Sequence, residues 1–192
     1  MRAYDMILVS MFVALMSVGA NITSMFPFLV IFGVPLTFQS FIAILTGAIL
    51  GSKRGALAMG LYALVGLAGA PIFTQFHGGI GMLVRPTFGF VLSFIVLAFV
   101  VGKIIERKQH PSFLTYLVAS MVGLLINYII GTNWMYGMYS LGFQAPDNFT
   151  YSLVWLWMLL PFVKDIILTV MAASIAYKLV AILPQRTAST VN

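Results

Sequence analysis

Charged side chains are scarce in this chain, and in two places they stand where they could bind an anion. Arg85 lies beside Pro86, between a glycine-rich loop and an apolar run. Far along the chain, Lys164 and Asp165 are adjacent at the start of another apolar run. A charge at the edge of a lipid-embedded run is unfavourable unless it is compensated, and by default it marks a functional site. We therefore expect these two places to meet and to hold a small anionic molecule.

The residue types at these places predict recognition. Arg85 and Lys164 would hold a carboxylate through charge-assisted hydrogen bonds. Asp165 would accept hydrogen bonds from the N–H groups of a neutral ring, and amide side chains would read the same ring. The amides expected to contribute are Asn127, Gln39 and Gln75. Apolar and aromatic walls would enclose an aliphatic or sulfur-containing body.

Catalytic and metal-binding patterns are missing from the sequence. Both histidines, His77 and His110, fall between apolar runs, and no G-x-S-G motif occurs. There is no cysteine and no phosphate-binding G-x-x-x-x-G-K-[ST] motif. The paired intramembrane carboxylates of a proton- or sodium-coupled carrier are also missing. We expect no metal and no cofactor, and any transport would draw its energy from another subunit. An intramembrane enzyme remains an alternative that rests only on the charges described above.

Composition indicates a membrane protein. Of the 192 residues, 61% are hydrophobic and 7% are charged, whereas soluble domains average about 25% charged residues. This balance predicts one polytopic domain over residues 1–183, followed by a short polar tail at 184–192. The net charge of +6 does not indicate a nucleic-acid partner, because the basic residues are scattered between apolar runs and serve as topology determinants.

Six apolar runs predict an all-α fold with six transmembrane helices. The expected runs are 6–25, 36–50, 55–70, 87–101, 113–131 and 161–179. Several are near or below the usual span of about 17–25 residues, which suits a substrate that enters partway into the bilayer. Pro161 fits the first turn of the last helix, and this places Lys164 and Asp165 in the same turn. Adjacent residues on a helix point about 100° apart, so these two need not pair with each other.

The basic residues sort to one side of the membrane if the runs alternate. Those on this side are Arg2, Lys53, Arg54, Lys103, Arg107, Lys108, Lys178 and Arg186. The positive-inside rule makes this side cytoplasmic and places both termini there. Arg85 is the only Lys or Arg in the opposite joints, which are residues 26–35, 72–86 and 132–160. We therefore expect Arg85 at the outer face, where chemistry rather than topology selects it.

Two further features bear on partners and ligand. Ser10 and Ala14 are small residues four apart on the first helix, a spacing that lets a neighbouring helix approach closely. That neighbour is either another helix of this chain or a partner protein. The joint 132–160 is rich in aromatic residues, which we expect mainly as an interfacial belt, with a few walling a ligand pocket.

Two segments carry a resemblance to a known family. Residues 66–73 (GLAGAPIF) and 85–90 (RPTFGF) resemble the BioY family. The chain length, the six expected spans and the adjacent Lys164 and Asp165 agree with this family over nearly the whole chain. In the second segment the family usually shows P-T-G-G-Y, where this chain has Phe88 and Phe90.

The resemblance implies a biotin-binding substrate (S) component of an energy-coupling factor (ECF) transporter in the cell membrane. Such a protein captures biotin with high affinity at the extracytoplasmic face. Its implied partners are a membrane-embedded coupling protein and two cytoplasmic ATPases that drive release inside. Family members carry an A-x-x-x-A pattern on the first helix for docking the coupling protein, and Ser10 and Ala14 stand at those positions here. Another vitamin, a flavin or thiamin, stays open as ligand, because the aromatics of 132–160 could stack on a ring system.

Overall fold

Helices make up most of the described chain, as an apolar chain in lipid requires in order to satisfy its backbone hydrogen bonds. The computed structural model describes residues 3–25, 30–31, 34–35 and 37–182. Its helices are α1 (Ala3–Asn21), α2 (Gln39–Leu50), α3 (Ser52–Leu67), α4 (Phe88–Glu106), α5 (Phe113–Ser140), α6 (Tyr151–Trp157) and α7 (Leu159–Ile182). Short 3-10 helices are η1 (Ile22–Met25), η3 (Thr74–Phe76) and η4 (Ile80–Val84). Two-residue strands β1 (Val30–Ile31) and β2 (Val34–Pro35) pair antiparallel. The polar tail expected at 184–192 lies outside the described residues.

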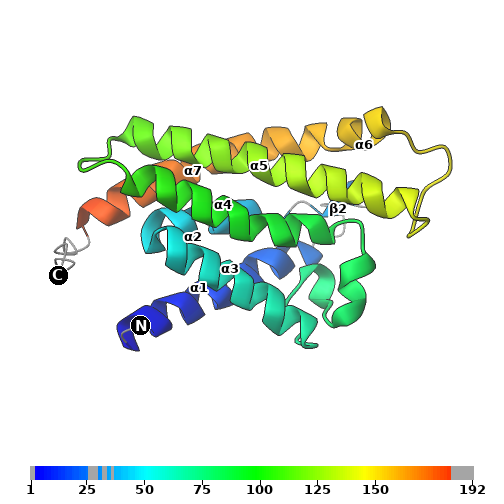
Figure 1. Cartoon of the computed structure of the whole chain (residues 1–192), viewed down its shortest axis with the longest axis horizontal. Helices are drawn as coiled ribbons and strands as arrows, with labels where there is room; N and C mark the ends of the chain where they lie inside the picture. Colours follow the sequence, from blue (N-terminus) through cyan, green and yellow to red (C-terminus); the bar gives the residue numbers. More distant parts are fainter. Residues whose placement is uncertain (1–2, 26–29, 32–33, 36, 183–192) are drawn as a thin grey trace.

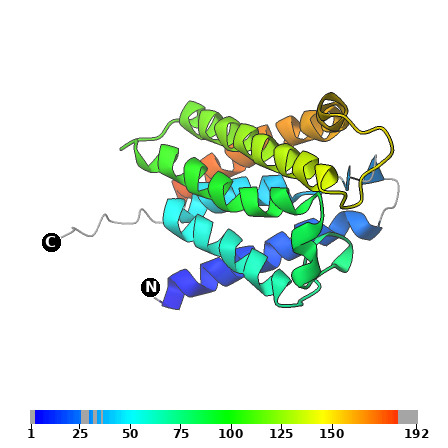
Figure 2. The ribbon, with the colours of Figure 1, turned by 45° about the vertical axis from the view of Figure 1, so that its right-hand side comes forward.

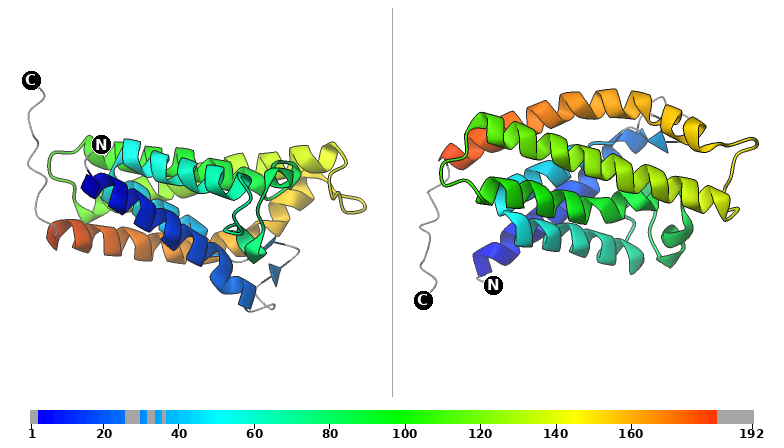
Figure 3. Two further views of the ribbon diagram at one scale, coloured as in Figure 1. Left: turned by 90° about the horizontal axis from the view of Figure 1, so that it is seen from below. Right: turned by 45° about the horizontal axis from the view of Figure 1, so that its top comes forward.

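The long helices run between two ends of the molecule (Figure 1). One end holds the α2–α3 turn, the α4–α5 loop, the N-terminal start of α1 and the C-terminal end of α7. We call it the basic end, because Lys53, Lys103 and Lys108 lie there. The opposite end, here called the loop end, holds the α3–α4 loop, the α5–α6 loop and β2. Both views in Figure 3 show the same division.

Helix α2 occupies the centre of the bundle. It packs against α1, α3, α4 and α7, and most of its residues are buried. Gly47 lies against the α4 backbone at Ala98 so closely that a Cβ would overlap it. Small residues at such crossings are how membrane helices pack. Helix α5 packs on α4 and α7, while α1 crosses α3 obliquely (Figure 2).

Several predicted helix boundaries differ from the observed ones, and two of these differences bear on the cavity described below. Helix α5 continues past Gly131 to Ser140, so Trp134 and Tyr139 belong to a helix rather than to a loop. No proline interrupts the chain between Pro111 and Pro146, and aromatic residues tolerate a helix well enough to extend it. Helix α7 begins at Leu159. The predicted charged pair therefore lies in the second turn of its helix rather than in the first.

Four of the described helices, α1, α4, α5 and α7, are long and apolar enough to cross a membrane. Helix α3 has 16 residues and α2 has 12, so each is shorter than a usual span. The structure therefore confirms the predicted all-helical fold, with four helices that could span a membrane among the described residues.

Candidate ligand-binding site

A cavity of about 180 Å³ lies at the loop end, among α2, the α3–α4 loop, α4, α5 and α7. All six side chains selected from the sequence line it, namely Arg85, Lys164, Asp165, Asn127, Gln39 and Gln75. They come from four separate segments, namely α2, the α3–α4 loop, α5 and α7, so the fold assembles one polar surface from residues that are far apart in the chain.

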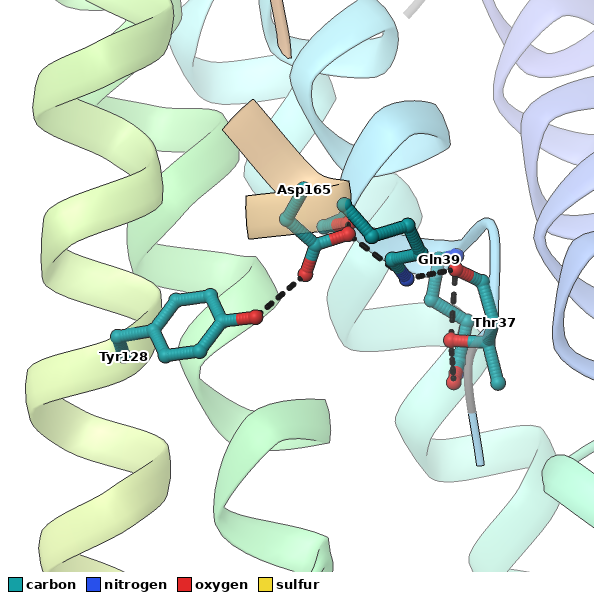
Figure 4. Close-up of polar contacts among 6 residues, drawn as sticks. Thr37, Gln39, Tyr128 and Asp165 are labelled. Carbon is teal, nitrogen blue, oxygen red and sulfur yellow. Dashed lines mark hydrogen bonds and ion pairs between the residues drawn. The ribbon is translucent and has the colours of Figure 1, made fainter. Parts of the chain in front are cut away.

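Asp165 is the centre of the polar network in this cavity. Its buried carboxylate accepts hydrogen bonds from Ser40 Oγ and the Tyr128 hydroxyl, each at 2.8 Å. Its Oδ1 also pairs with Lys164 Nζ at 2.8 Å, a pairing of neighbours that the sequence did not require. A buried charge is tolerated when it is paired and hydrogen-bonded. Figure 4 shows Tyr128 approaching Asp165 from the side opposite Gln39.

Lys164 connects α7 to the segment that precedes α2. Its Nζ donates a hydrogen bond to the backbone carbonyl of Thr37 at 2.6 Å, in addition to its ion pair with Asp165. An ammonium group has three protons, so one proton remains for a further acceptor in the cavity.

Arg85 differs from Lys164 because its guanidinium has no protein partner among the described residues. Its backbone, by contrast, is fixed at both polar atoms. The N–H donates to the Met82 carbonyl at 3.0 Å, and the Arg85 carbonyl accepts from Trp134 Nε1 at 3.4 Å. The side chain is half-buried. A positioned guanidinium with all five N–H donors unengaged suits two-pronged binding of a carboxylate.

Gln39 is held by neighbouring side chains. Its Nε2 donates to the Tyr62 hydroxyl at 3.0 Å, and its Oε1 accepts from Thr37 Oγ1 at 3.1 Å and Thr74 Oγ1 at 3.2 Å. The contact with Thr37 is visible in Figure 4. Both acceptor positions of the amide oxygen are therefore occupied, and a single amide N–H is left for the cavity. Gln39 thus orders the cavity wall.

The other two amides are less constrained. Asn127 Oδ1 lies 2.6 Å from Ser93 Oγ, and the other polar atom of this buried amide has no partner among the described residues. Gln75 is exposed at the rim, where its backbone adopts φ 61° and ψ 32°. This left-handed conformation is uncommon outside glycine. It is held by a hydrogen bond from the Gln75 N–H to Ser24 Oγ at 3.0 Å.

The segment 66–73 shapes the cavity floor through one aromatic contact. The ring of Phe73 lies directly over Gly66, where any Cβ would overlap it. Phe73 also packs edge-on against Tyr62 and Phe88, with ring centroids 5.3 and 5.8 Å apart. Phe88 is fully buried, so the side chain that replaces the usual glycine of the second segment fills core space against Phe73.

Asn21, at the end of α1, clamps the α3–α4 loop. Its Nδ2 donates to the Ile72 carbonyl at 3.1 Å, and its Oδ1 accepts from the Phe76 N–H at 2.7 Å. Sequence analysis missed Asn21, and it also missed Ser40 and Tyr128. Ser40 follows Gln39 and Tyr128 follows Asn127. The sequence did offer a signal for both residues, because each is an isolated polar side chain next to a predicted site residue within an apolar run.

The aromatic residues of 132–160 mostly contact one another. Tyr136 packs edge-on against Phe149 and Tyr151, and Tyr139 packs against Phe149 and Trp157. Tyr139 is the aromatic of this region that lines the cavity, within the described part of the chain.

The small residues of α1 face outward. Ser10 and Ala14 are exposed, whereas Val9, Phe12 and Met16 form the buried face of the helix. Exposed Ile7, Met11 and Val18 lie on the outward side with them. Within the described residues, this surface is therefore not used for close packing inside the chain.

The fold and the cavity define a multi-pass membrane protein with a polar ligand site at one end. The model of the BioY family matches residues 1–185. The chain is 47% identical over 176 residues to BioYB of Bacillus subtilis (strain 168), covering 92% of this chain and 87% of that protein. It is 40% identical over 127 residues to the biotin transporter BioY of Thermotoga maritima, covering 66% of this chain and 71% of that protein. The chain belongs to the BioY family, which confirms the resemblance found in its sequence.

A solved structure has a similar fold. It is the crystal structure at 2.1 Å of the S-component for biotin from an ECF-type ABC transporter. The TM-score is 0.69 at 18% sequence identity, with 93% of this chain and 94% of that chain covered. Family membership and the long apolar helices place the chain in the cell membrane.

Proposed function

We propose that this protein is the S component of an ECF-type transporter and binds biotin in the cavity at the loop end. Its relatives are named biotin transporters. The observation that carries the assignment to this cavity is the Arg85 guanidinium, which is unpaired within the described part of the chain and lines the same space as the Lys164–Asp165 pair.

The chemistry of biotin matches the groups that the cavity offers. Its carboxylate would take the free donors of Arg85 and the remaining proton of Lys164. Its ureido ring offers two N–H donors and one carbonyl. Among the described residues, Asp165 Oδ2 accepts from Tyr128 alone and so retains a lone pair for one N–H. Asn127 would engage the same ring. Gln75 would close the rim. Apolar walls from Phe73, Phe90 and Met158 would enclose the sulfur ring and the aliphatic chain.

The biotin assignment is stronger than the two alternatives. Among the described aromatics of 132–160, Tyr139 lines the cavity, and its ring already packs edge-on against Phe149 and Trp157, which leaves little aromatic surface for stacking on a flavin or thiamin ring. The relatives are named transporters, which supports a transport subunit over an enzyme.

We extend the proposal to the membrane topology. Helices α2 and α3 complete six spans, the basic end is cytoplasmic with both termini, and the cavity faces outward. The basic residues Lys53, Lys103 and Lys108 gathered at one end support this orientation through the positive-inside rule.

The partners follow from the same assignment. The exposed face of α1 around Ser10 and Ala14 would dock a membrane-embedded coupling protein, because small residues let helices approach closely. Two cytoplasmic ATPases would then supply the energy for release.

Calorimetric titration of the purified protein with biotin tests this proposal. In Arg85→Ala we expect the free energy of binding to weaken by about 2–5 kcal/mol, as when one partner of a buried charge pair is removed. The control is Arg107→Ala, which removes the same charge at the basic end and should leave the Kd unchanged. Equal affinity of Arg85→Ala and wild type would refute the site, and tighter binding of riboflavin or thiamin than of biotin would refute the ligand.

A further inference from the structure

A second, larger cavity lies at the basic end, with a volume of about 630 Å³. It is a groove between the α2–α3 turn, the end of α4 and the start of α5. Lys53, Lys103 and Lys108 line it, each from a different segment. None of the three lysines forms an ion pair or a side-chain hydrogen bond with another described residue. The groove therefore presents three exposed ammonium groups without a counter-ion from the described residues.

The remaining charges around the groove are already engaged. Arg54 pairs with Asp5 of α1 at 3.0 Å. Glu106 Oε1 accepts from the Ser52 N–H at 2.8 Å, and its Oε2 accepts from the Ser52 hydroxyl at 2.6 Å. Gly102 permits this close contact, because a Cβ there would overlap the Ser52 backbone. Glu106, the carboxylate that lines the groove within the described part of the chain, is thus anchored to the α2–α3 turn.

The groove is apolar as well as basic. Ile49, Tyr116 and Val180 form part of its wall, so a ligand that fits it has an anionic group and an alkyl portion. The apolar spans α4 and α5 end and begin beside it. The lysines are therefore at the depth of lipid headgroups, where basic pockets between helices bind anionic lipids.

We propose that this groove binds an anionic phospholipid, with the phosphodiester on Lys53, Lys103 and Lys108 and an acyl chain along the apolar wall. The assignment is independent of the ligand bound at the loop end, since the two cavities are at opposite ends of α4.

Native mass spectrometry of the detergent-solubilised protein tests the proposal with two lipids of equal chain length, phosphatidylglycerol and zwitterionic phosphatidylcholine. Wild type should retain phosphatidylglycerol selectively. The variant Lys53→Gln/Lys103→Gln should bind it about thirtyfold more weakly, because each lysine near an anionic surface contributes about fivefold. The matched control is Arg107→Gln/Lys178→Gln, which removes two exposed positive charges at the same end but outside the groove, and its affinity should change less than about twofold.

Several outcomes would overturn the assignment. Equal retention of the two lipids would exclude headgroup recognition. An equal loss in both double variants would reduce the effect to general charge attraction. Full competition by glycerol phosphate at millimolar concentration would assign the groove to a free phosphate compound, and displacement of the lipid by an acidic peptide would assign it to a protein partner. Circular dichroism and biotin titration of the groove variant distinguish these results from misfolding, because neither lysine lines the loop-end cavity.

Discussion

Asp165 at the loop end and Glu106 at the basic end are both hydrogen-bonded carboxylates with lysines close by. Asp165 is buried, pairs with Lys164 and accepts two hydroxyl donors. Glu106 is exposed and, among the described residues, accepts hydrogen bonds from Ser52 alone. The same residue types therefore form a closed network at one end and an open basic surface at the other.

The difference between the two ends comes from burial. In a low-dielectric interior an unpaired polar group is expensive, so partners must be present and well placed. At an exposed end, water and salt screen the charges, and lysines can remain without a protein partner. A rigid arrangement suits selection of one small ligand, whereas a screened surface suits attraction of a lipid headgroup.

The largest expected effect is that of Asp165→Ala, which removes the closed network at its centre. Lys164 would lose its counter-ion, and two hydroxyl groups would lose their acceptor. We expect the free energy of unfolding to fall by about 3 kcal/mol, which is the low end of the range for breaking a buried ion pair, because Lys164 is partly exposed. We also expect loss of biotin binding. Thermal unfolding in detergent measures the first effect and calorimetry the second. Asp147→Ala, in the exposed α5–α6 loop, is the control, and an unfolding temperature equal to that of Asp165→Ala would contradict the comparison.

A smaller effect is expected for Tyr128→Phe, which removes one donor to the buried carboxylate and keeps the ring. A hydrogen bond to a charged group contributes about 1.5–3 kcal/mol, and we expect biotin affinity to fall by a comparable amount. Tyr136→Phe serves as the control, because the Tyr136 hydroxyl has no hydrogen-bond partner among the described residues. Unchanged affinity in Tyr128→Phe would mean that Asp165 is oriented without this tyrosine.

Ligand binding at the two ends should differ in its dependence on salt concentration, which can be measured without any mutation. Raising ionic strength from 0.1 to 1 M shortens the Debye length from about 10 to about 3 Å. Phosphatidylglycerol affinity should fall about tenfold, whereas the Kd for biotin should change less than about threefold, since buried pairs are screened less. Parallel titrations at the two salt concentrations provide the measurement. An equal salt dependence of both ligands would remove the distinction between a closed and an open end.

The smallest effect is expected for Glu106→Gln. The glutamine keeps an acceptor for the Ser52 N–H, so stability should change by about 1 kcal/mol or less, as for exposed charges. Removing a negative charge from the groove should leave phosphatidylglycerol affinity equal or slightly higher. Native mass spectrometry checks this, and weaker lipid binding would show that Glu106 helps to hold the headgroup.

The sequence predicted the class, the family and the main charged residues of the candidate site, because a rare charge in an apolar chain stands out. It did not predict where α5 ends, since no proline or cap marks Gly131. It also missed Tyr128 and Ser40 as partners of Asp165. That contact depends on the rotation of three helices about their axes, which weak amphipathic patterns do not specify.

Helix α2 links the two ends of the molecule directly. With 12 residues it extends about 18 Å, and neighbouring helices surround it, so it need not match a hydrocarbon layer of about 30 Å. Its first residues line the loop-end cavity and its last residues line the groove. One short internal helix therefore lies between the two cavities, and a shift of α2 by a single turn would displace wall residues of both cavities together.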